Sequence, residues 1–83
     1  MFNLKEASFG EELVIREVRG EDYQIEYLSP LGIVEGREII VIKNGKLKDS
    51  LIVSINGLTY HLNKDIISRI YVEEKSKVNK KVR

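Results

Sequence analysis

The hydrophobic residues of this chain follow a period of two in five short segments, which glycines and polar residues separate. Such alternation is typical of β-strands that bury one face. We therefore expect a first strand that runs from Leu13 through Val18 and ends at Gly20. Four further strands are predicted over residues 38–43, 50–56, 58–62 and 69–73.

Two Asn-Gly pairs mark turns between these segments. Asn56-Gly57 stands between the third and fourth predicted strands. Both central positions of the tightest hairpin turn need a positive φ, which Asn and Gly tolerate, so this pair predicts a two-residue β-hairpin. The second pair, Asn44-Gly45, lies in the polar stretch 43–49, and that polarity indicates a longer loop.

Two segments break the alternation and indicate helical structure. Residues 21–28 predict a short helix with acids in its first turn, where the helix dipole favours them. Pro30 limits this helix, because the preceding residue, Ser29, is disfavoured in the α region. Asn63 is placed to cap one helical turn over 63–68. The pattern as a whole predicts a mainly β fold, a small closed five-stranded SH3-like barrel with one short helix after strand 1 and a helical turn before strand 5.

The alternation also assigns side chains to the inside or the outside of the barrel. Ile40, Ile42 and Ile52 should point outward as neighbours. They form either a docking face or a surface that the N-terminal segment or Tyr71 covers. The residues expected inside are Leu13, Ile15, Val18, Leu28, Leu31, Ile33, Ile39, Val41, Leu51, Val53, Ile55, Tyr60, Leu62, Ile67, Ile70 and Val72.

Length and charge restrict the functional classes. With 83 residues, 42% of them hydrophobic and 33% charged, the chain has the balance of one small globular domain. Residues 75–83 hold five basic residues and no acid, which leaves nine basic and thirteen acidic residues, a net charge of −4, on residues 1–74. We expect a folded domain over 1–74 and a disordered basic tail over 75–83. The acidic balance of the domain disfavours nucleic-acid binding.

Cysteine content and hydropathy place the chain in a cellular compartment. Without cysteine it has neither disulfides nor thiolate zinc sites. Its longest apolar run, 39–42, is far shorter than the roughly 20 residues of a membrane helix. We therefore expect a soluble, cytoplasmic protein without direct membrane insertion.

Candidate catalytic and metal-binding residues are few. The single histidine, His61, lies in a predicted strand on the face opposite Tyr60 and Leu62, which predicts an exposed strand residue. Acid pairs such as Glu11-Glu12 are adjacent, so in a strand their side chains point to opposite faces, and the GxxxxGK[ST] motif is absent. The sequence predicts no enzyme, no catalytic residue, no metal ligand set and no cofactor, with at most a weak or indirect association with divalent metal.

The stretch Leu28–Gly36, LSPLGIVEG, resembles the segment L-x-x-L-G-I-x-P-G of the FeoA domain, the small cytosolic component of bacterial and archaeal ferrous iron transport. A domain of this type also closes the chain of many DtxR-like metal-dependent repressors. The element order is similar from Gly10-Glu11 onward, so the resemblance covers roughly residues 3–74. The chain departs from the family at Glu35, where proline is favoured, and at Pro30, where the helix usually continues. The motif residues are Leu28, Leu31, Gly32, Ile33, Gly36, Asn56 and Gly57.

The segment also makes physical sense from its residues. Gly32 is placed to take the left-handed conformation that ends a helix. Gly36 stands at the position of a type II turn over 34–37 that requires a positive φ. The apolar residues Leu28, Leu31 and Ile33 are expected to hold the helix and its exit against the open end of the barrel.

The resemblance implies a non-enzymatic accessory protein that docks on the cytosolic, GTP-binding part of the FeoB transporter, at the inner membrane surface. Two surfaces compete for this role. The helix-exit surface comprises Tyr27, Pro30, Val34 and Glu35. The strand face comprises Ile40, Ile42 and Ile52, and it would equally serve self-association through a two-fold interface.

The alternative function is that of a small-barrel nucleic-acid-binding module. The basic tail and four tyrosines favour it. The net charge of −4 on residues 1–74 disfavours it, and Tyr71 alone is expected to be exposed on a strand as a stacking platform for bases.

Overall fold

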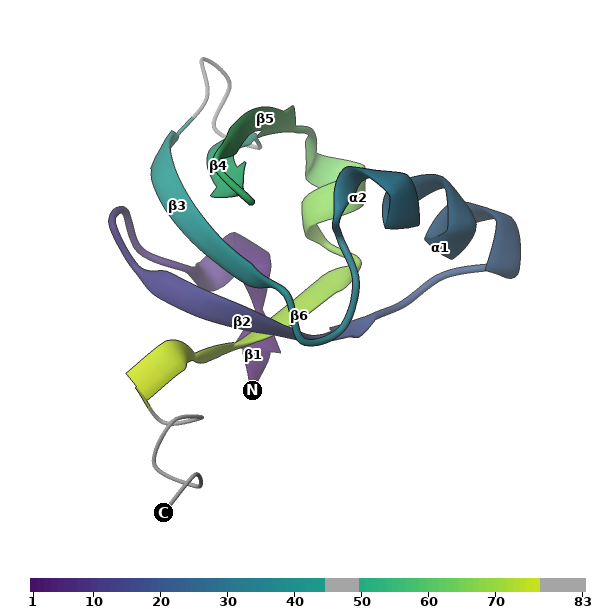
Figure 1. The fold of residues 1–83 in the computed structure, drawn as a ribbon, viewed down its shortest axis with the longest axis horizontal. Helices are drawn as coiled ribbons and strands as arrows, with labels where there is room; N and C mark the ends of the chain where they lie inside the picture. Colours follow the sequence, from purple (N-terminus) through teal and green to yellow (C-terminus); the bar gives the residue numbers. More distant parts are fainter. Residues whose placement is uncertain (45–49, 77–83) are drawn as a thin grey trace.

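The computed structural model describes residues 1–44 and 50–76. One antiparallel sheet with the strand order β1-β6-β2-β3-β4-β5 curls around the core, and two helices lie beside each other at one end (Figure 1). The strands are β1 (Phe2–Asn3), β2 (Glu12–Val18), β3 (Glu38–Asn44), β4 (Leu51–Ile55), β5 (Leu58–Leu62) and β6 (Ile70–Glu74). The helical elements are η1 (Leu4–Glu6), α1 (Asp22–Leu28), η2 (Ser29–Leu31) and α2 (Lys64–Ile67).

The predicted mainly β, SH3-like fold is confirmed, but the strand count and the closure of the barrel are corrected. A sixth strand, β1, pairs with β6 through Phe2 opposite Val72. Its two residues are too few to produce a periodic signal. The sheet has two ends, β1 and β5, so backbone pairing among the described residues does not close the barrel. Instead α2 packs against η1, and Leu4 and Ile67 from these two elements complete the core.

Every residue expected inside the barrel lies in the core or packs against it, with Val18, Leu31 and Tyr60 partly buried. The sequence pattern missed Leu4 and Val14, which are also buried. Val14 points to the outer face of β2, the third strand from one end of the sheet. It pairs there with Glu38 on β3 and with Glu73 on β6.

The local signals for the helices are largely correct. Glu21 precedes α1, and its N–H donates to Oε1 of Gln24 at 2.7 Å. Asn63 caps α2, because its Oδ1 accepts from the N–H of Ile66 at 3.0 Å. One expectation is wrong: Ser29 remains in the right-handed helical region, with φ −58° and ψ −46°. The chain accommodates Pro30 by tightening into the 3₁₀ turn η2, which needs no N–H at its first positions.

None of the helices in the described ranges combines the length and the apolar character that a membrane crossing requires. The loop of residues 45–49 and residues 77–83 of the basic tail predicted over 75–83 lie outside the described residues. The first two residues of that predicted tail, Lys75 and Ser76, are described and adopt a helical conformation after β6.

Candidate functional site

A groove of about 440 Å³ runs between α1 and α2. Tyr23 and Tyr27 lie one helical turn apart along its α1 side, and their exposed fractions are 71% and 70%. Leu28 and Ile66 add apolar lining from the two helices. Tyrosine combines a large apolar ring with a polar hydroxyl and is enriched at protein interfaces. This groove, the α1–α2 groove, is therefore the strongest candidate for a docking site.

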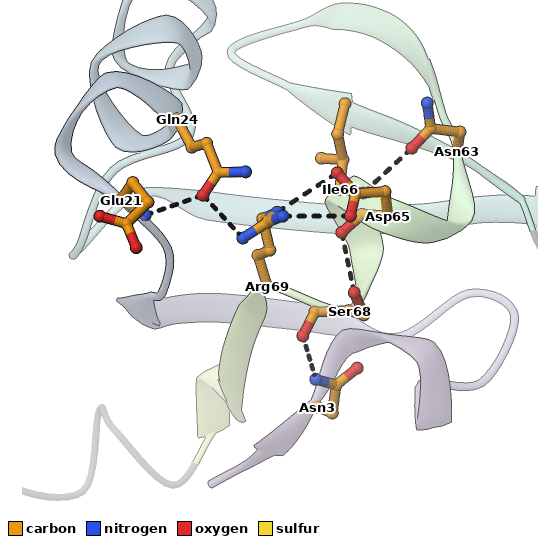
Figure 2. A network of polar contacts seen from close by, with 8 residues as sticks. All are labelled: Asn3, Glu21, Gln24, Asn63, Asp65, Ile66, Ser68 and Arg69. Carbon is orange, nitrogen blue, oxygen red and sulfur yellow. Dashed lines mark hydrogen bonds and ion pairs between the residues drawn. The ribbon is translucent and has the colours of Figure 1, made fainter.

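Arg69 ties the two sides of the α1–α2 groove together (Figure 2). Its guanidinium donates to Oε1 of Gln24 on α1 at 2.9 Å, and to the two carboxylate oxygens of Asp65 on α2 at 3.1 and 3.3 Å. The network continues to β1, because Nδ2 of Asn3 donates to the carbonyl of Ser68 at 2.8 Å. Arg69 therefore fixes how α1 sits relative to α2, and with it the width of the groove.

Arg69 does not stand out in the sequence as a site residue, because the strand pattern places it at the start of the last predicted strand. One available signal was its spacing from Asp65. An acid and an arginine four positions apart lie on the same face of a helical turn and pair there. The contact with Gln24, 45 positions away, had no counterpart in the pattern.

The structure divides the predicted helix-exit surface. Tyr27 lines the α1–α2 groove, whereas Val34 and Glu35 line a separate hollow on the other side of α1 with Ile25 and Glu26. Pro30 is exposed on η2 and lines neither of these two hollows. The four residues therefore do not form one continuous patch. The division arises because η2 and the following turn carry the chain around the end of α1.

The motif glycines occupy the predicted conformations. Gly32 ends η2 with φ +89°, and the N–H of Ile33 donates back to the carbonyl of Leu28 at 3.2 Å. Gly36 has φ +91°, and the N–H of Arg37 donates to the carbonyl of Val34 at 3.2 Å, as a type II turn requires. These turns lead from the end of α1 into β3.

The predicted hairpin at Asn56-Gly57 is also confirmed. The two residues have φ values of 57° and 79°, which are typical of the type I′ turn. Ile55 and Leu58 pair directly across this turn. The hairpin therefore sets the register of β4 against β5.

The strand face is less continuous than predicted. Ile42 lies at a bulge where the register shifts, so Ile52 on β4 pairs with Lys43 and not with Ile42. Ile40 instead faces Ser54 on β4 and Glu12 on β2. The N-terminal segment and Tyr71 do not cover this face, because β1 and β6 lie beyond β2. Of the three isoleucines, Ile42 is the most exposed, at 39%.

The proposed stacking platform for nucleic acid is already occupied. The guanidinium of Arg19 lies 4.0 Å from the centroid of the Tyr71 ring, as in a cation–π contact. Glu17 holds Arg19 in this position, because its two carboxylate oxygens accept hydrogen bonds from the guanidinium of Arg19 at 2.8 and 3.2 Å. This hydrogen bond keeps the pKa of Glu17 below its ordinary value. The expectation that Tyr71 presents a free ring is therefore wrong.

The single histidine takes part in a simple polar contact. Nε2 of His61 lies 3.1 Å from Oγ of Ser50, and His61 is exposed on the outer face of β5 opposite Ile52. Within residues 1–44 and 50–76 no three His, Cys, Asp or Glu side chains gather as metal ligands would. Two carboxylates from different strands do meet at one lysine. Nζ of Lys75 lies 4.0 Å from Oε1 of Glu12 on β2 and 3.2 Å from Oε1 of Glu38 on β3.

Comparisons with known proteins agree with this geometry. The solution structure of a FeoA protein from Chlorobium tepidum is similar, with 24% sequence identity and a TM-score of 0.80, over 89% of this chain and 70% of that chain. The solution structure of a FeoA-like protein from Clostridium acetobutylicum is similar with 22% identity and a TM-score of 0.79, over 89% of this chain and 86% of that chain. The crystal structure of ScaR with bound Cd²⁺ is similar over 89% of this chain (22% identity, TM-score 0.79), which spans 36% of the ScaR chain.

A search of curated protein sequences gave no significant match. The family profile described as the FeoA domain matches residues 2–74, which include every described strand and helix from β1 to β6. The chain therefore belongs to the FeoA domain family.

Proposed function

We propose that this protein is a non-enzymatic, cytoplasmic accessory protein of ferrous iron transport, which docks on the cytosolic domain of the FeoB transporter at the inner membrane surface. Membership of the FeoA family supports the role in iron uptake. The observation that carries the docking role is the α1–α2 groove, where two tyrosines about 70% exposed stand beside apolar lining.

The groove is suited to docking because it is both apolar and rigid. Burying the rings of Tyr23 and Tyr27 removes apolar surface from water, at roughly 25 cal/mol per Å². Arg69 holds α1 against α2 in the free protein, so little ordering remains to be done on binding. Regulation of the transporter further requires that the groove bind two conformations of that domain with different affinities.

The test is an NMR titration of the isotope-labelled protein with the cytosolic FeoB domain. We expect shifts clustered at Tyr23, Tyr27 and Ile66. The variant Tyr27→Ala should weaken binding by about ten-fold or more, as truncation of an interface tyrosine commonly does. Ile42→Ala, an exposed apolar truncation on the strand face, is the matched control and should bind as the wild type does.

Each contrary outcome has a distinct meaning. Loss of binding in Ile42→Ala with retention in Tyr27→Ala would transfer the docking role to the strand face. Fe(II) alone and a short RNA serve as controls in the same titration. Absence of any response to the FeoB domain, with salt-sensitive shifts on adding RNA, would overturn the proposal in favour of nucleic-acid binding.

A further inference from the structure

The edge of β5 presents unpaired backbone hydrogen-bonding groups. β5 is the last strand of the sheet and pairs with β4 alone. In an antiparallel hairpin with a two-residue turn, the pair beside the turn is hydrogen-bonded, and such pairs then alternate with non-bonded ones. Ile55–Leu58, Val53–Tyr60 and Leu51–Leu62 are therefore the bonded pairs. It follows that the N–H and C=O groups of Thr59 and His61 point away from β4. No other described segment bonds to them.

This edge lacks the features that usually block strand addition. Soluble proteins protect edge strands with charges, prolines or bulges. β5 has none of these, and residues 50–63 contain no charged residue although 33% of the chain is charged. At the opposite end of the sheet, β1 has two residues and leads directly into η1. The β5 edge is thus the long, open and uncharged one.

We infer that β5 pairs with β5 of a second copy of this chain, antiparallel about a two-fold axis at Tyr60. In that register Thr59 pairs with His61 of the second copy. By the two-fold symmetry, His61 pairs with Thr59 of the second copy. These two residues carry the outward N–H and C=O groups, so the pairing forms four backbone hydrogen bonds without register mismatch. Leu58, which is 59% exposed, then lies beside the second copy's Leu62.

The absence of charged residues along β5 favours a second copy of this chain as its partner. A charged side chain near a two-fold axis meets its own equivalent, with the same sign, across the interface. The uncharged run 50–63 removes that repulsion along the whole of β5. Because five-residue strands bury little surface, the dimer should be weak, with a Kd on the order of 0.1–1 mM.

The first measurement is amide hydrogen exchange by NMR at protein concentrations of roughly 0.05 and 2 mM, on either side of the expected Kd. The amides of Thr59 and His61 should gain protection with concentration. The amide of Tyr60, which faces β4, should be protected from exchange at both protein concentrations. Sedimentation over the same range should show the mass rise toward that of a dimer. A monomer at the higher concentration with unprotected Thr59 and His61 amides would overturn the inference.

A charge exchange tests the register. The variant T59K/H61K should be monomeric, because like charges face each other across the axis, and T59E/H61E should be monomeric for the same reason. Mixed in equal amounts, the two should form a heterodimer, since each Lys now faces a Glu. Both positions are exposed, so the monomers remain folded. Failure of the mixture to associate would overturn the proposed self-pairing, whereas binding to FeoB through Tyr27 would be unaffected.

Discussion

The guanidinium of Arg69 donates a 2.9 Å hydrogen bond to Oε1 of Gln24, 45 positions earlier in the chain. The same oxygen accepts the N–H of Glu21 at the start of α1. One side chain in the turn just before β6 therefore stabilises the first turn of α1 and, through Asp65, the position of α2. The groove proposed to dock FeoB depends on this bridge.

Removing the bridge should destabilise the fold moderately. Arg69→Ala breaks hydrogen bonds to Gln24 and Asp65 in a side chain that is 24% exposed, and we expect a loss of about 1–2 kcal/mol in the free energy of unfolding. Thermal unfolding should show Tm lowered by about 4–15 °C for a domain of this size. Arg19→Ala, which removes a more exposed ion pair, is the control and should lower Tm by less than Arg69→Ala does. Equal losses in the two variants would contradict the bridging role.

Two glycines with the same backbone conformation should differ in their tolerance of alanine. Gly32 and Gly36 have φ values of +89° and +91°, but a Cβ at Gly32 would lie 3.2 Å from Cγ2 of Ile55, whereas one at Gly36 would meet nothing within 4 Å. Both substitutions carry the cost of a left-handed residue, about 1 kcal/mol. Chemical denaturation should show Gly32→Ala less stable than Gly36→Ala by a further 1 kcal/mol or so. Similar stabilities would mean that the loop relaxes around the new methyl group.

The cap of α2 should contribute measurably to stability. Asn63→Ala removes the acceptor for the N–H of Ile66 and should cost about 1 kcal/mol in urea unfolding. Asn63→Asp keeps an acceptor at the same position and should retain most of that stability. The groove-lining Ile66 should shift in NMR spectra of the alanine variant, because it lies in the turn that the cap holds.

Stability should fall in acid partly through Glu17. The hydrogen bond from Arg19 holds the pKa of Glu17 in the folded protein below the ordinary value of 4.5. A carboxyl with a depressed folded pKa stabilises the fold above the unfolded pKa, and the contribution is lost as pH falls through the folded value. Glu17→Gln should therefore lower stability slightly in the neutral range and converge with the wild type in acid, so that its stability declines less steeply below about pH 4.5. An identical acid profile in the variant would exclude this contribution.

Local interactions explain why much of the architecture was predictable. Residues near one another in the chain determine the hairpin at Asn56-Gly57, the cap at Asn63 and the turn at Gly36. Alternation along each strand likewise assigns inward side chains without knowledge of their partners. The Leu28–Gly36 segment combined these signals in the order that identified the family.

The candidate site depended on contacts that alternation does not encode. Tyr23 was not singled out, because an exposed helix residue has no distinctive period. Its role appears once α2 lies opposite α1 and Arg69 joins them. The helix-exit surface was predicted as one patch because its members are close in sequence, but η2 turns the chain and separates Val34 and Glu35 from Tyr27.

By itself, then, the sequence determined the strands, the turns, the inward-facing residues and the family, since each follows from backbone preferences and side-chain alternation over a few residues. The tertiary structure decided the sixth strand, the open β5 edge, the groove between α1 and α2 and the covering of Tyr71 by Arg19. All four arise where segments distant in the chain meet, and the geometry of such meetings comes from packing of the whole core.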